Sequence, residues 1–325
     1  MTILDEISKA VDERGGEFTA LSDQIWDNPE LRWNEFASVT AQIEVAERAG
    51  FTVQRQVAGI PTAFYAEHGT GGPVIAILGE FDSLAGLSQE SGVAVRQPDP
   101  ANESGNGQGC GHHLLGTGSL LAAVAVARFL DGNGLPGRVR YYGCPAEEAA
   151  AGKSFMVKGG AFADVDAAVS WHPASVTGVM RADVLAYCQA YFSFDGVAAH
   201  AGAAPWLGRS ALDAAELMNV GVNFLREHMP PDTRIHYAFV DSGGPSPNVV
   251  HPPPACTTSC ALPTSRRCAP CTSGWSRSPR GRRGADDGNV PRGRVRRRLR
   301  RAAAERRPRA GDARHRGPAR SGPLR

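Results

Sequence analysis

The end of this chain lacks the amino acids from which a hydrophobic core is built. From residue 252 to residue 325 the sequence has 20 arginines, no lysine, 4 acidic residues and no Ile, Phe, Tyr or Met. The first 251 residues hold 15 basic and 29 acidic residues, and every Ile, Phe, Tyr and Met of the chain. A segment with so few large apolar side chains cannot bury enough surface to offset its loss of conformational entropy. We therefore predict a folded part over residues 1–251 and a basic, disordered tail over residues 252–325.

Hydrophobic patterns before the tail predict alternating helices and strands. They are, in chain order, helical periodicity over residues 3–25, an apolar run at 73–81, a long apolar segment at 114–130, and short runs at 138–144 and 166–173. The short runs are typical of strands, and the long segment, apolar almost all round, is typical of a buried helix. This alternation predicts an α/β fold whose parallel or mixed sheet is flanked by helices.

The N-terminus and the cysteines indicate the compartment. The first residues are acidic and amphipathic, without the positive and then apolar regions of a signal peptide. Gly116, Gly118 and Arg128 interrupt the apolar segment 114–130, which we therefore do not expect to span a membrane. Seven cysteines, an odd number, argue against a disulfide scaffold. We expect a soluble, cytoplasmic protein.

The pattern changes from residue 185 onward. A long strand that ends near His200 is followed by a helical segment at 208–229 and a strand at 234–243. This strand–helix–strand order predicts a second, smaller α+β unit. We place the first unit at residues 1–184 and the second at 185–251.

Polar residues follow three predicted strands of the first unit. They are Glu80 and Asp82, then Glu147 and Glu148, and finally His172. In open α/β sheets, sites form beyond the carboxyl ends of the strands, so these side chains are expected at one edge. The glycine-rich loop before the long helix adds Cys110 and His112 to the same edge. The sequence thus predicts a cluster of thiolate, imidazole and carboxylate groups.

This donor set predicts metal-assisted hydrolysis. Thiolate, imidazole and carboxylate are ligands of zinc, and zinc-bound water has a pKa near ~7. The adjacent residues Glu147 and Glu148 must point in different directions. One carboxylate can therefore bind a metal while the other takes and returns a proton, which is the machinery for cleaving an amide.

The motifs themselves resemble those of metallopeptidase family M-twenty, the aminoacylase and carboxypeptidase-like amidohydrolases. The resemblance is carried by GCGHHLLGTG (109–118), YYGCPAEEAAAGKSFMVKGGAF (141–162) and VSWHP (169–173). A narrower similarity, to the aminobenzoyl-glutamate hydrolase branch, is carried by LSDQIWDNPELRW (21–33), LGEFDSLAGLSQ (78–89) and GRSALDAAELM (208–218). The resemblance covers residues 1 to about 251 almost continuously. They imply a zinc-peptidase-like fold and hydrolysis of an amide bond next to a carboxylate-bearing amino acid.

The resemblance also implies roles for single residues. The metal ligands would be Cys110, His112, Glu148 and His172. Glu147 would be the general base, and Glu80 and Asp82 orienting carboxylates. The cofactor would be two divalent ions, zinc or manganese, with zinc favoured by Cys110. Relatives have Asp or Asn where this chain has His113, which we expect to face away from the metals.

In the family, the second unit is a lid that also dimerises, so residues 185–251 would be part of such a domain. His200 would help to stabilise an oxyanion in a partner's active site, and Asn248 would contact substrate. The implied substrate is aminobenzoyl-glutamate or another N-acyl amino acid. The implied partner is a second copy or a related A-type subunit, with no role for membranes or nucleic acid.

Two interpretations of the tail remain open. Its cysteine pairs Cys256/Cys260 and Cys268/Cys271 are compatible with a small zinc module on nucleic acid, although the spacing between the pairs is unusually short. Alternatively, arginine without lysine is what GC-rich codons give out of frame, and shifted codons near 255–260 can encode a good strand. A frameshift would remove the rest of the catalytic sheet and a final histidine ligand, which the resemblance implies. We would then expect a poorly folded or inactive chain.

Other functions that stay open are an inactive scaffold with a nucleic-acid-binding tail, and a dipeptidase or acylase of the same clan.

Overall fold

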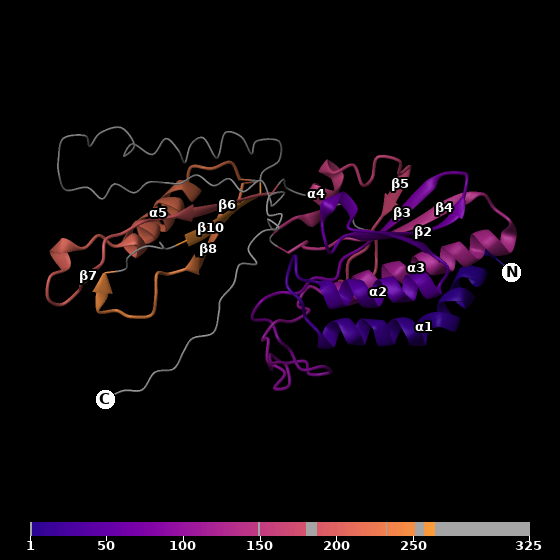
Figure 1. Cartoon of the computed structure of the whole chain (residues 1–325), viewed down its shortest axis with the longest axis horizontal. Helices are drawn as coiled ribbons and strands as arrows, with labels where there is room; N and C mark the ends of the chain where they lie inside the picture. The colour runs from indigo at the N-terminus through magenta and orange to yellow at the C-terminus, as the bar shows by residue number, and fades with distance from the viewer. Residues whose placement is uncertain (1, 149, 180–186, 232, 251–256, 264–325) are drawn as a thin grey trace, which may run out of the picture.

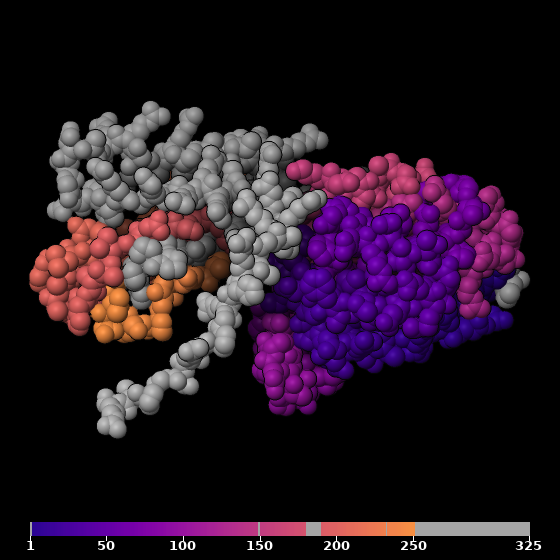
Figure 2. Space-filling view, viewed as in Figure 1, coloured from indigo at the N-terminus to yellow at the C-terminus, as the bar shows by residue number. Residues whose placement is uncertain are grey.

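The computed structural model describes residues 2–148, 150–179, 187–231, 233–250 and 257–263. Figure 1 shows two bodies, one built on a five-stranded sheet with helices and one on α5 with two small sheets. Figure 2 shows that part of the loop between β3 and α3, which comprises residues 80–111, projects from the first body.

The first body is a mixed α/β layer. Its helices are α1 (Ile3–Asp27), α2 (Phe36–Arg48), α3 (His112–Asn133) and α4 (Gly152–Lys158), with a 3-10 turn η1 (Val57–Gly59). Its strands are β1 (Thr52–Arg55), β2 (Phe64–Thr70), β3 (Val74–Gly79), β4 (Gly137–Gly143) and β5 (Ala167–Val169). The strand order is β1-β2-β4-β3-β5, in which β3 runs parallel to β4 and β5, and β2 runs antiparallel to β1 and β4. The predicted α/β class with a mixed sheet and flanking helices is confirmed.

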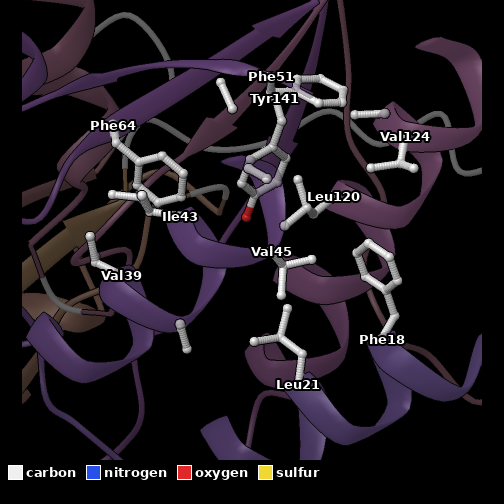
Figure 3. Packing of buried hydrophobic residues seen from close by; sticks show 14 of the residues in the cluster. Phe18, Leu21, Val39, Ile43, Val45, Phe51, Phe64, Leu120, Val124 and Tyr141 are labelled. Atoms are coloured by element: carbon white, nitrogen blue, oxygen red, sulfur yellow. The ribbon is translucent and has the colours of Figure 1, made fainter. Parts of the chain in front are cut away.

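The core explains why α3 is apolar almost all round. This helix contacts α1 and also lies against β3 and β4. Figure 3 shows Leu120 and Val124 of α3 between Phe18 of α1 and Tyr141 of β4. Although α3 is long and apolar enough by composition to cross a membrane, more than half of its most apolar window is buried inside the protein. Each large apolar side chain buried here contributes about 1.5–3 kcal/mol.

The register of the sheet aligns the ends of its central strands. Gly79, the last residue of β3, pairs with Gly143, the last residue of β4. β5 pairs alongside, with Val169 next to Ile77. The segments that follow all three strands therefore emerge at the same edge, as the sequence predicts.

The second body contains a strand–helix–strand unit, a third strand in the same sheet and a separate pair of short strands. Its elements are β6 (Tyr187–Ser193), β7 (Ala199–His200), η2 (Pro205–Leu207), α5 (Ala211–Arg226), β8 (His236–Asp241), β9 (Val249–Val250) and β10 (Thr257–Pro263). Helix α5 begins after Ser210, whose Oγ accepts a hydrogen bond from Asp213 N at 3.1 Å. β7 pairs with β9, and the three-stranded sheet has the order β6-β10-β8.

Strand β10 lies beyond the predicted start of the tail at residue 252. It pairs antiparallel to both β6 and β8, so these seven residues form the middle of a sheet. Arginine is absent from them, and two adjacent threonines favour extended structure. Over Thr257–Pro263 the structure thus differs from the expected disordered tail. The other residues from 251 onward, including Cys256, Cys268 and Cys271, lie outside the described part of the chain.

Candidate metal site and catalytic edge

His112 is the first residue of α3 and lies at the centre of the candidate site. Its side chain is fully buried, and its Nδ1 lies 3.0 Å from both Asp82 Oδ1 and the Asp82 carbonyl oxygen. Both are acceptors, so Nδ1 carries the proton and donates. Burial disfavours the charged ring, but Asp82, Glu80 and Glu148 outweigh this effect and raise the pKa of His112.

The other ring nitrogen of His112 has the environment of a metal ligand. Nε2 has no hydrogen-bond partner among the described residues, although Glu80 Oε2 lies 3.1 Å away. A lone pair on nitrogen and one on a carboxylate oxygen repel each other unless a proton or a cation lies between them. A carboxylate that fixes one nitrogen of a histidine while the other stays free is a common arrangement around bound metal.

Two further ligand types lie beside His112. Cys110 Sγ is 3.3 Å from His172 Nε2, and the rings of His112 and His172 have centroids 5.8 Å apart. His172 Nδ1 lies 2.9 Å from the Pro173 carbonyl oxygen, which fixes that ring in turn. One potential ligand atom from each of Cys110, His112 and His172 lies within 4.8 Å of the other two. A sulfur and two nitrogens at this separation suit a transition metal such as zinc.

The pKa of the Cys110 thiol reflects both the burial of this site and the negative charges around it. Burial, followed by the negative charges of Glu148, Glu147 and Glu80, raises the pKa of Cys110 to about 12. The thiol therefore keeps its proton in the bare protein. A bound metal ion reverses this effect because its positive charge deprotonates a coordinating thiol.

A second group of potential ligands shares His112 with the first. Oxygens of Glu80 and Glu147 lie within 4.8 Å of each other and of a nitrogen of His112. Burial, then the charges of Glu80 and Glu148, raise the pKa of Glu147, and a proton carrier needs a pKa nearer to neutrality. The sequence motifs imply that Glu80 only orients other residues. In the structure its oxygen is itself one of the potential ligand atoms.

Glu148 is held next to both groups. Its backbone N donates to Asp82 Oδ2 at 2.8 Å, so Asp82 bridges His112 and the Glu147–Glu148 pair. Its carboxylate is, after burial, the largest cause of the raised pKa of the Cys110 thiol. The structure therefore brings six of the sequence-predicted residues together around His112: Glu80, Asp82, Cys110, Glu147, Glu148 and His172.

Lys153 is a site residue that the sequence analysis does not single out. It lies in the first turn of α4, and its Nζ forms an ion pair with Glu80 Oε1. It brings one positive charge to a cluster with four carboxylates. The only sequence signal is its place five residues after Glu148, and a lysine there is ordinarily expected in solvent.

His113 turns away from the cluster. Its ring packs edge-on against Trp26 with centroids 4.9 Å apart, and burial lowers its pKa to about 4. Among the residues that the structure describes, it belongs to neither group of potential ligands. This position agrees with the expectation that His113 is not a ligand.

His200 and Asn248 lie in the second body. His200 Nδ1 accepts hydrogen bonds from Gly202 N and Ala203 N, both at 3.1 Å, and its side chain is exposed. The carbonyl oxygen of Asn248 accepts from Ala201 N at 2.9 Å, which joins the two loops. Within the described residues, neither side chain belongs to the groups around His112. Their roles toward a partner and a substrate stay predictions.

Comparisons with known proteins decide the family. No family model matches the chain. It is 52% identical over 244 residues to the B-type subunit of p-aminobenzoyl-glutamate hydrolase from Escherichia coli, a match that covers 75% of this chain and 50% of that protein. Over 255 residues it is 31% identical to the Xaa-Arg dipeptidase of Mus musculus, which covers 75% of this chain and 54% of the relative. Over the matched part, the chain is similar in sequence to these hydrolases.

The likeness in fold extends to a solved structure of an aminobenzoyl-glutamate utilization protein from Klebsiella pneumoniae. That structure has a TM-score of 0.56 at 19% identity, over 83% of this chain and 72% of the other. The sequence identity confirms the resemblance to the aminobenzoyl-glutamate hydrolase branch of family M-twenty, and the solved structure confirms the fold. The chain spans about half the length of the curated relatives that it matches.

Proposed function

We propose that the chain is a metal-dependent amidohydrolase of the aminobenzoyl-glutamate type, which cleaves an amide bond next to a carboxylate-bearing amino acid. The observation that carries this proposal is the buried Nε2 of His112, without a hydrogen-bond partner among the described residues and next to Cys110 and His172. The 52% identity to one subunit type of p-aminobenzoyl-glutamate hydrolase supports this substrate over the dipeptide substrates of the more distant relatives.

Each residue at the edge has a part in this mechanism. Cys110, His112, Glu148 and His172 would hold the metal, and Asp82 keeps His112 in the tautomer that leaves Nε2 free. When bound, a divalent ion lowers the pKa of water so that it can attack an amide carbonyl. Glu147, at the exposed rim of the cluster, would take a proton from the attacking water and pass it to the leaving nitrogen.

Zinc is the metal that the donor set favours, since a thiol accompanies two imidazoles. Both groups of potential ligands include His112. Because its Nδ1 is bonded to Asp82, only Nε2, with a single lone pair, is free to bind one ion. The described residues therefore support one centre at a time. The second ion implied by the family motifs would need ligands from residues that the structure does not describe.

A partner is the other part of the proposal. The exposed face of α5 carries Leu217, Val220 and Phe224 at helical spacing, with 62%, 47% and 72% of each residue exposed. Such a stripe is typical of a helix that docks on another protein surface. We propose that it contacts a second copy or an A-type subunit, and that His200 then acts in the partner's site. Phe224→Lys should shift the chain to monomer in sedimentation experiments, whereas an unchanged mass would contradict this.

The experiment that tests the hydrolase assignment measures zinc and activity together. We expect the full chain to bind zinc, and Cys110→Ala with His112→Ala to abolish binding. Release of p-aminobenzoate from p-aminobenzoyl-glutamate should require zinc and Glu147, and we expect a low rate in a chain of half the relatives' length. Zinc binding that survives the double substitution would contradict the proposed site. Hydrolysis that persists in Glu147→Gln would contradict the proposed base.

A further inference from the structure

We propose that Glu35 is a positioning residue, which fixes the backbone from which Glu147 acts. This proposal rests on the proposed function. Glu35 precedes α2 and is fully buried, and its Oε1 accepts a hydrogen bond from Ala146 N at 2.8 Å. Because Ala146 is the residue before Glu147, this bond anchors the base across 111 positions of sequence.

The loop that carries Glu147 has a conformation that needs an anchor. Ala146 and Ala151, on either side of the glutamate pair, have φ of +54° and +53°, a left-handed backbone that is unfavourable for residues with a Cβ. Gly152 N donates to the Ala146 carbonyl oxygen at 2.9 Å, and a Cβ on Gly152 would lie 1.9 Å from the Pro145 oxygen. The loop is thus closed on itself, and Glu35 ties it to the core.

The segment that holds Glu35 also fixes the second loop of the site. Ser83, which follows Asp82, donates from its N and its Oγ to the carbonyl oxygen of Glu30, at 2.9 Å and 2.6 Å. Asp82 in turn orients His112. Residues 30–35 therefore fix the positions of two loops, the one that carries Glu147 and the one that carries Asp82.

Glu35 is hard to explain by stability alone. Its Oε2 is buried and has no hydrogen bond of normal geometry among the described residues, although the nearby Thr62 hydroxyl lowers the pKa of this carboxyl group. Burial is also the largest of the effects that raise the pKa of Glu35 to about 7. An incompletely paired buried carboxyl group costs stability, so an apolar residue of similar size would give a more stable core. We infer that the acid is retained because its Oε1 holds Ala146.

The test compares Glu35→Leu, which removes the acceptor, with Glu35→Gln, which keeps a carbonyl oxygen. Gln42→Met is the matched control, because Gln42 is also fully buried and polar but bonds Tyr141 Oη and the Ser38 carbonyl oxygen instead. Hydrogen exchange of residues 144–152 in the full chain is the first readout. We expect exchange at least about 10-fold faster in Glu35→Leu and near wild type in the other two variants.

The second readout is hydrolysis of p-aminobenzoyl-glutamate with zinc. A misplaced base should lower kcat about 10-fold or more in Glu35→Leu and leave KM within about 2-fold, with rescue in Glu35→Gln. Three results would overturn the proposal: wild-type exchange in Glu35→Leu, equal acceleration in Gln42→Met, or no rescue by Glu35→Gln. If the wild-type chain hydrolyses nothing, the proposed function fails, and the exchange result alone decides the role of Glu35.

Discussion

The two bodies of the molecule differ in how many of their large apolar side chains they bury. In the first body Phe64, Leu120 and Tyr141 are completely buried. In the second body Trp206, Leu217 and Phe224 have 69%, 62% and 72% of their surface exposed. The first body is therefore held by its own core, whereas the second offers a surface that suits another protein.

The first body also has both a covered and an exposed part of its sheet. β3 and β4 are flanked by strands on both sides, but in the described structure β5 pairs only with β3. All three residues of β5 are exposed, and Trp171, next to His172, is 44% exposed. Among the described strands, β5 is thus an exposed apolar edge beside the candidate site.

The largest expected effect is a difference in zinc affinity between a substitution in the first body and one in the second body. We expect His112→Ala to weaken zinc binding by about 1000-fold or more, because it removes a ligand from a buried set. His200→Ala, in the second body, should leave zinc affinity unchanged. Titration with a competing chelator measures both, and equal losses would show that the site is not confined to the first body.

A matched pair of leucines measures the difference in packing. Leu120→Ala should lower the free energy of unfolding by about 2–5 kcal/mol because it leaves a cavity in the core. Leu217→Ala should change it by no more than about 0.5 kcal/mol in the monomer, because the side chain is already in solvent. Chemical denaturation followed by tryptophan fluorescence gives both values. A large loss from Leu217→Ala would mean that the second body has a core that includes this face.

The orientation of His112 is the next test. Asp82→Asn keeps the shape of the side chain but removes the charge that fixes the Nδ1 proton, and it should reduce zinc affinity by about 10–100-fold. Asp131→Asn, which alters a carboxylate beside the distant His68, is the control. An Asp82 variant that binds zinc like the wild type would contradict the assigned tautomer.

The smallest effect should be the pH dependence that arises from Glu35. Its pKa is raised from 4.5 to about 7 on folding, so the unfolded chain releases this proton first as the pH rises. The stability contribution is complete below pH 4.5 and is lost by about pH 7, for a total of roughly 1–3 kcal/mol. Glu35→Gln should remove this part of the slope. Unfolding curves between about pH 4.5 and 7.5 measure it, and an unchanged slope would assign it to other groups.

Much of the site can be predicted from sequence because apolar runs reveal where strands end. The runs that became β3, β4 and β5 place Glu80, Glu147 and His172 beyond strand ends without any structure. The motifs then assign a chemical role to each of them. The structure adds their separation and the tautomer of His112.

Other features depend on contacts that sequence cannot show. In the sequence Lys153 resembles an ordinary surface lysine, and only the fold shows that α4 places it next to Glu80. In the sequence Glu35 resembles a charged residue at the start of a helix, and only the fold shows its hydrogen bond with Ala146. β10 has no apolar alternation, and it becomes a strand because β6 and β8 offer it backbone partners on both sides. Each depends on residues distant in sequence.

X-ray absorption at the zinc edge of the full chain tests the central claim most directly. The account predicts one sulfur neighbour at about 2.3 Å and two imidazole nitrogens at about 2.0–2.1 Å, with the sulfur lost in Cys110→Ala. A shell without sulfur would contradict it. So would a shell of several sulfurs that persists in Cys110→Ala, because the metal would then be held by the cysteines of the tail.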